Sequence, residues 1–217
     1  MKFTAPKAAL LSAGVVVVLS GSPGGASASG MPDNLIMHAT AIEQLEWQGD
    51  GRFVWEMEGW SGTSLNRLTY AVESDVRSGH SPEHEFSLGW QKAITAFWDA
   101  KTQLRYDKAH DGDVLRLGAG LTGTLPYFVH FDGVVMFGSG DVLLDLELIH
   151  ELPLNQNWKF ESRVDVEVIN GLEEASVGVR LQHESANRLT RYVGIEWQRS
   201  PLDKAHTALV AGVSYWY

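Results

Sequence analysis

Two short stretches near the start of the chain carry side chains that bind metal ions. Met31, Met37 and His38 lie within eight residues of each other, and His80 and His84 are four residues apart in the run GHSPEHEF. Thioether sulfur and imidazole nitrogen are ligands that suit transition metals. The first group predicts a small soft-ligand site on an N-terminal arm, and the second predicts a divalent-ion site in a loop. The alternatives are an ordinary arm and a solvated polar loop.

Two further pairs lie inside segments of alternating polarity. His130 and Asp132 alternate with Val129 and Phe131, and Glu56 and Glu58 alternate in the same way with apolar neighbours. Because successive side chains of a strand point to opposite faces, each pair shares one face, the polar one. We expect these four side chains to point into an enclosed space and offer nitrogen and oxygen ligands there. The alternative is that they form ion pairs with nearby arginines, since buried charges need partners.

The elements that must position these residues are strands. Apolar and polar residues alternate with a period of two through nearly all of the chain, and short Gly-, Pro- or Asn-containing runs separate the alternating segments. This pattern predicts an all-β fold of about twelve antiparallel strands. The expected ranges are 38–47, 52–59, 66–74, 84–92, 96–106, 113–122, 126–137, 142–151, 158–169, 174–183, 189–198 and 206–217.

Alternation alone fits a soluble sandwich or a lipocalin-like barrel as well as a membrane barrel. Three features favour a closed transmembrane barrel: an even number of strands, a heavily ionised polar register with both signs of charge, and aromatic residues near the strand ends of the apolar register. The last strand, TALVAGVSYWY (207–217), has no charge at all. In a closed barrel it pairs with the first strand, and Tyr215 and Tyr217 face the periplasmic interface with lipid. The aromatic residues assigned to the lipid-facing register are Trp47, Trp60, Trp90, Trp98, Tyr106, Tyr127, Trp197, Tyr215 and Tyr217.

The beginning of the chain is typical of a secretory signal peptide. Lys2 and Lys7 precede the apolar run ALLSAGVVVVL, and Ala26-Ser27-Ala28 has the small-x-small pattern of a cleavage site. We therefore expect a signal peptide at 1–28, a short periplasmic arm at 29–37 and the barrel at 38–217. The chain has no cysteine and a formal net charge of -10. Such an acidic protein is a poor ligand for nucleic acid, whose binding depends on Lys and Arg.

Three stretches resemble a known family in order along the chain. They are EQLEWQGDGRFVWEMEGWSGTSLNRLTYAVESD (43–75), RYVGIEWQR (191–199) and LVAGVSYWY (209–217), and the similarity continues between them. They resemble the copper resistance protein B family. The resemblance implies an outer-membrane barrel that is surrounded by outer-membrane lipid and binds or exports copper ions. It also implies an association with periplasmic copper-resistance proteins. Members of that family carry a long Met- and His-rich segment before the barrel, which is reduced here to SGMPDNLIMHAT (29–40).

These observations lead to one expected function and several alternatives. We expect a non-enzymatic protein of the outer membrane of a Gram-negative bacterium that binds copper ions or helps them leave the periplasm. An acidic lumen would attract such cations. The first alternative is a general small-solute channel or structural barrel with no metal role. The second is an outer-membrane lipid hydrolase, for which Ser162 lies in the lipid-facing register without a histidine placed near it by spacing. The third is a soluble periplasmic sandwich.

Overall fold

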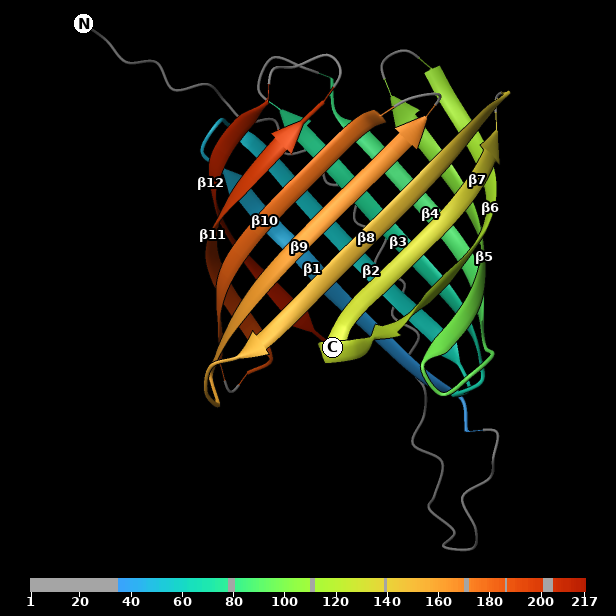
Figure 1. Cartoon of the computed structure of the whole chain (residues 1–217), viewed down its shortest axis with the longest axis horizontal. Coiled ribbons are helices and arrows are strands. Elements are labelled where there is room, and N and C mark those ends of the chain that lie inside the picture. Colours follow the sequence, from blue (N-terminus) through green and yellow to red (C-terminus); the bar gives the residue numbers. More distant parts are fainter. Residues whose placement is uncertain are drawn as a thin grey trace, which may run out of the picture. The chain divides into compact units, whose positions relative to one another are not determined.

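The protein forms a closed antiparallel β-barrel of twelve strands (Figure 1). The computed structural model describes residues 35–77, 81–109, 112–138, 140–169, 172–185, 187–200 and 205–217. This architecture confirms the predicted fold. The strands are β1 (Met37–Gln48), β2 (Arg52–Gly62), β3 (Asn66–Arg77), β4 (Glu83–Ala93), β5 (Trp98–Ala109), β6 (Gly112–Leu125), β7 (Val129–Gly138), β8 (Asp141–Pro153), β9 (Trp158–Ile169), β10 (Leu172–Glu184), β11 (Leu189–Arg199) and β12 (His206–Trp216).

Every strand pairs with the next one along the chain, and β12 pairs with β1 to close the ring, with Gln48 opposite Val210. Closure leaves no unpaired sheet edge, which is what a barrel in hydrocarbon requires. Both chain ends of the barrel, at Met37 and Tyr217, lie at the same rim, which we call the terminal rim. The connections β2–β3, β4–β5, β6–β7, β8–β9 and β10–β11 also lie there. The other connections form the opposite rim.

The outer surface is apolar and the inner one is polar, as the alternation predicts. In β12, Leu209 is 67% exposed, whereas the neighbouring Val210 is 2% exposed. The closing strand thus has no charge because its outward residues form part of the apolar belt. Aromatic rings accompany this belt toward the terminal rim, where Trp98 and Phe131 meet edge to face with centroids 5.7 Å apart. The amphipathic indole ring of Trp98 suits a membrane–water interface at this position.

One aromatic residue was assigned to the wrong face. Trp60 is paired with Thr69 in the same register as Glu56 and Glu58, so it lies on the inner side. The guanidinium of Arg67 lies 5.4 Å from its ring centroid, a cation–π contact.

Three local departures from regular strands were not predicted. The expected strand 126–137 begins later, at Val129, because Pro126–Phe128 forms a 3₁₀ turn in which Tyr127 and Phe128 both have positive φ. The expected strand 96–106 begins at Trp98 and continues to Ala109. In β1 the register shifts between Ile42 and Gln44, which is a β-bulge. A bulge places one extra residue on one strand and breaks the alternation locally.

Helices are almost absent from the described part of the chain. No helix there is long and apolar enough to cross a membrane.

Candidate functional site: the barrel lumen

The inner wall of the barrel carries most of the ionised side chains, and acidic ones outnumber basic ones. Cross-strand pairing fixes which residues share the inner face, because directly opposed residues point to the same side. Inward carboxylates include Glu46, Glu56, Glu58, Glu73, Asp75, Glu85, Asp99, Asp107, Asp132, Asp145, Glu147, Glu151, Glu161, Asp165, Glu167, Glu184 and Glu196. Inward bases on the described strands include Arg52, Arg67, Arg77, Lys101, Arg105, Arg116, Lys159, Arg163 and Arg180.

A cavity of about 700 Å³ occupies the lumen toward the terminal rim, and we call it the vestibule. Its wall includes residues beside the terminal turns, such as Phe128, Arg188 and Trp216, so it lies next to that rim. Seven carboxylates line it against four bases and one histidine. The ionisable residues are Glu43, Glu56, Glu58, Glu147, Glu151, Glu161, Glu184, Lys159, Arg163, Arg180, Arg188 and His130.

Ion pairs neutralise the vestibule unevenly. On its β8–β10 side, Arg163 Nε lies 3.3 Å from a carboxylate oxygen of Glu147, and Lys159 Nζ lies 3.6 Å from Glu151 and 3.7 Å from Glu184. In the described part of the chain, the carboxylates of the β1–β2 side form no ion pair, and Arg163 acts on Glu56 only from a greater distance. The negative charge of the vestibule is therefore concentrated on that side.

Three carboxylates make up this uncompensated side. Among the described residues, no Lys or Arg forms an ion pair with Glu43, Glu56 or Glu58. The β1 bulge turns both Glu43 and Gln44 into the cavity, where Glu43 faces Glu58. One oxygen of Glu43 is buried without a hydrogen-bond partner. A buried carboxylate oxygen without a donor is costly and is open to a cation.

Some of the predicted ligands meet in this cavity. His130, Glu56 and Glu58 all line the vestibule, as expected from their register. Asp132 lies on the inner face as expected, but it accepts a 2.5 Å hydrogen bond from Lys101 Nζ and does not line the cavity. Asp132 therefore follows the alternative expectation, an ion pair with a nearby base. His130, Glu56 and Glu58 instead lie where a dissolved cation would reach them.

The remaining predicted ligands are not brought together. Met37 and His38 are neighbours in β1, paired with Gly62 and Ser61, so their side chains leave opposite faces of the sheet. His84 pairs with Ser74 and lies in the outward register of β4. Met31 and His80 lie outside the described residues. In the described part of the chain, no group of three or more His, Asp or Glu side chains is arranged to hold a metal ion.

A buried ion-pair cluster centred on Arg180 borders the vestibule. Arg180 donates to Glu46 at 3.0 Å and to Glu196 at 2.7 Å, and it lies 3.6 Å from Glu161. The Arg180 and Glu46 side chains are 4% and 1% exposed. The ring of Tyr192 covers the guanidinium at 5.7 Å. These contacts join β1, β9, β10 and β11 on the inside of the wall.

The inner faces of β7 and β8 carry apolar side chains near the turn that connects these two strands. Met136 and Leu143 are completely buried and Val134 is 2% exposed, although all three face inward. The lack of side chains at Gly118 and Gly120 on β6 makes room for Met136 and Val134. A water-filled pore would expose its lining, so the lumen has no such passage along these residues.

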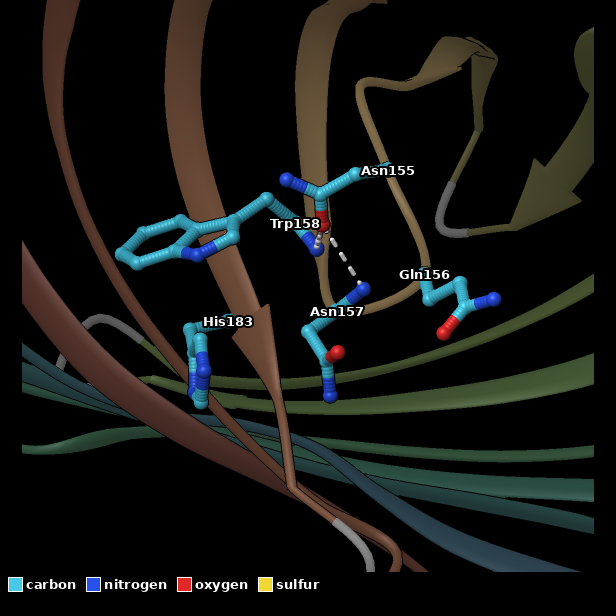
Figure 2. A pocket seen from close by; sticks show the side chains of 5 residues that line it. All are labelled: Asn155, Gln156, Asn157, Trp158 and His183. Atoms are coloured by element: carbon cyan, nitrogen blue, oxygen red, sulfur yellow. Dashed lines mark hydrogen bonds between the residues drawn. The ribbon is translucent and has the colours of Figure 1, made fainter.

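A second, shallower pocket of about 390 Å³ lies at the terminal rim on the turn between β8 and β9 (Figure 2). The side chain of Asn155 accepts hydrogen bonds from the backbone N–H groups of Asn157 and Trp158, which fixes the turn. The Trp158 ring meets His183 edge to face with centroids 4.7 Å apart. The Asn155 amide oxygen serves the turn itself, so this pocket offers less free chemistry than the vestibule.

Residues on the outer face of β8 and β9 are relevant to the alternative of a lipid hydrolase. The register of β8 and β9 pairs Ser162 with His150, a neighbour that spacing along the sequence did not indicate. A Ser–His dyad needs a third group to orient the histidine. The cross-strand partners that flank this pair are Val129 and Val179, which are apolar. The arrangement therefore lacks an adjacent acid.

Comparison with known proteins gives one family and one fold. The model of a family described as copper resistance protein B precursor (CopB) matches residues 36–217. A copper resistance protein B homolog from Pseudomonas syringae pv. tomato (strain ATCC BAA-871 / DC3000) is 26% identical over 210 residues, which cover 85% of this chain and 71% of that protein.

Solved structures with the same fold include two porins. The KdgM porin in complex with disordered oligogalacturonate superposes with a TM-score of 0.55 at 10% identity, covering 82% of this chain and 99% of its own. The NanC porin gives a TM-score of 0.55 at 9% identity with the same coverage. At such identities the similarity concerns the fold alone.

Proposed function

Because this chain belongs to the copper resistance protein B family, we propose that its vestibule binds copper ions at the side of the outer membrane where the chain ends lie. The observation that carries the proposal is the group of unpaired carboxylates Glu43, Glu56 and Glu58, which shares one cavity with His130. Copper is the cargo of this site rather than a resident cofactor.

The location of the protein follows from its family and its surface. It is an outer-membrane barrel, with an apolar belt outside, polar residues inside and no open edge. The word precursor in the family description agrees with a signal peptide at the start of the chain. In such barrels the chain ends lie on the periplasmic side, so the vestibule is proposed to collect copper from the periplasm.

The chemistry of the cavity favours Cu(II) over Cu(I). Carboxylate and imidazole groups are ligands that suit Cu(II), whereas Cu(I) prefers thioether or thiolate sulfur. The cavity wall contains oxygen and nitrogen donors and no methionine. The excess of carboxylates over bases raises the local concentration of cations in a low-dielectric enclosure. The ligands line one cavity but are not pre-arranged around an ion, so binding requires the glutamate side chains to converge on it.

The packed middle of the lumen supports sequestration or regulated export over free diffusion. Met136 and Leu143 pack into the inner wall of β7 and β8, and the Arg180 cluster occupies part of the lumen beside the vestibule. A general small-solute channel would need a hydrated path through this region. We therefore propose copper binding in the vestibule as the primary function and copper passage through the lumen as a subsequent step. The proposal includes no chemical reaction.

Copper titration of the folded, full-length mature barrel in detergent micelles tests the proposal. Calorimetry and the Cu(II) electron paramagnetic resonance (EPR) signal should report one bound ion, and the double variant Glu56→Gln/Glu58→Gln should weaken its affinity by about tenfold or more, as expected for the loss of charged ligands. Glu83→Gln is the matched control because Glu83 is an exposed inward carboxylate at the start of β4, near the opposite rim. Unchanged affinity in the double variant would refute the vestibule site.

A deletion separates the vestibule from the N-terminal arm. Removing residues 29–36 eliminates Met31 and keeps β1 intact, because the strand begins at Met37. The proposal expects unchanged Cu(II) stoichiometry in this deletion. Loss of the bound ion there would place the site on the arm instead.

A further inference from the structure

Arg105 on β5 forms ion pairs with carboxylates from both sides of the lumen. Its guanidinium lies 2.8 Å from Glu85 on β4, and its Nε donates a 2.6 Å hydrogen bond to Asp107 on β5. It also reaches Asp145 on β8 and Glu167 on β9, each at 3.2 Å. The Arg105 side chain is only 10% exposed. Four carboxylates from four strands therefore converge on one cation.

This contact crosses the lumen instead of following its wall. Strands β6 and β7 separate β5 from β8, so the bonds from Arg105 to Asp145 and Glu167 span the enclosed space. The other cationic clusters are more local. Arg180 contacts β9 and β11, the neighbours of β10, and Glu46 on β1, three strand positions away. Arg67 contacts Asp99 two strand positions away, whereas Arg105 reaches Glu167 four positions away. Among the ion pairs of the described residues, those of Arg105 therefore reach farthest around the barrel.

We propose that Arg105 determines which ions cross the lumen, an inference that rests on the proposed function of the vestibule. The guanidinium occupies the position among the four carboxylates that a passing cation would take and joins the two walls, so it bars monovalent ions. A divalent cation passes only by taking the place of the guanidinium among the four carboxylates. Oxygen ligands that already surround one positive charge can coordinate another, and the higher charge of a divalent ion favours the exchange.

The partial solvation of the carboxylates makes this exchange feasible. Asp145 and Glu167 have side chains 39% and 31% exposed, although the arginine between them is nearly buried. Water and ions therefore reach the acids from one side while the guanidinium stays in place. Arg116 pairs with Asp107 from β6, so one positive charge remains near the cluster after Arg105 moves away.

Conductance of single barrels in planar lipid bilayers tests the role of Arg105. In potassium chloride the unaltered protein should conduct poorly, and Arg105→Gln should raise potassium conductance by at least about tenfold, the change that a barrier lowered by about 1.4 kcal/mol produces. Arg105→Lys keeps the charge and should retain most of the block. Arg67→Gln, which removes an inward arginine nearer the terminal rim, is the control and should leave conductance unchanged.

A second variant guards against misfolding of Arg105→Gln. The pair Asp145→Asn/Glu167→Gln removes only the cross-lumen contacts and leaves Arg105 with Glu85 and Asp107. It should also raise potassium conductance, and folding of each variant is checked by heat-dependent mobility on gels. High conductance of the unaltered protein, or no rise in folded variants of both kinds, would overturn the role of Arg105.

A parallel titration distinguishes this inference from the proposed function. Arg105→Gln should bind Cu(II) in the vestibule with the stoichiometry of the unaltered protein, because the vestibule carboxylates are untouched. If the unaltered protein binds no Cu(II), the proposed function fails whatever the conductance shows. If Cu(II) binds normally and Arg105→Gln does not conduct, only the inference about Arg105 fails.

Discussion

Replacing Arg180 by methionine should destabilise the barrel strongly. The guanidinium holds Glu46 and Glu196 at 3.0 and 2.7 Å, and the Glu46 side chain is 1% exposed. Without Arg180, the Glu46 carboxylate would remain buried with only the amide of Gln48, 3.1 Å away, as a donor. Breaking a buried ion pair by removing one partner costs about 3–5 kcal/mol, so we expect the free energy of unfolding to fall by that amount.

A double variant distinguishes the loss of charge compensation at Glu46 from the loss of packing at Arg180. Arg180→Met combined with Glu46→Gln removes both members of the pair and leaves no uncompensated charge at position 46. It should recover about half or more of the lost stability, because neutral replacement of a buried pair is often tolerated. Urea-induced unfolding in lipid vesicles, followed by tryptophan fluorescence, measures the free energy of unfolding.

The matched, more exposed ion pairs are those of Lys159 with Glu151 and Glu184 in the vestibule wall. These contacts are longer, at 3.6 and 3.7 Å, and the side chains are 37–50% exposed. Lys159→Met should therefore cost about 1 kcal/mol or less. Equal losses in Arg180→Met and Lys159→Met, or no recovery in the double variant, would refute the reasoning that burial makes the Arg180 cluster decisive.

Three further substitutions test the two faces and one turn, each by the same unfolding assay. Leu88→Arg puts a charge at the middle of β4 on the outer face, where Leu88 is 50% exposed. It should lower the free energy of unfolding by about 2–4 kcal/mol. A cost near zero would mean that this face does not touch lipid. Gly118→Ala would bring a methyl group to 2.6 Å from Cγ of Met136, and this overpacking should cost about 1–3 kcal/mol. Gly178→Ala meets side-chain atoms of Arg180 and Glu196 at 3.2 Å or more and should cost less than Gly118→Ala. Tyr127→Asn should stabilise the barrel by about 1 kcal/mol, because Tyr127 has φ 66° and asparagine tolerates that conformation better. The Tyr127 side chain is 86% exposed, so little packing is lost. A loss of stability would show that the ring makes an important contact.

The alternation of polarity was enough to predict the strands and their faces. A period of two follows directly from strand geometry, so Leu209 and Val210 could be assigned outward and inward without a structure. The same rule would have placed Trp60 correctly, since it shares the register of Glu56 and Glu58. Its assignment to the lipid face came from its residue type alone.

The candidate site could be predicted only in part. Register placed Glu56, Glu58 and His130 in the lumen, but Glu43 enters the vestibule through a bulge whose position leaves no mark in the pattern. The Arg105 cluster was also beyond reach, because it depends on which strands face each other across the closed barrel. That relation is set by the stagger of the strands, which alternation does not encode.

The position of a bound Cu(II) ion tests the account most directly. The chain has no cysteine, so a single one can be introduced for a nitroxide spin label at Asn155 on the terminal rim or at Asp50 on the opposite rim. Pulsed EPR then measures the distance from each label to the ion. The account predicts a shorter distance from the label at 155 than from the label at 50, and loss of both signals in Glu56→Gln/Glu58→Gln. An ion closer to position 50, or one that survives that substitution in place, would contradict it.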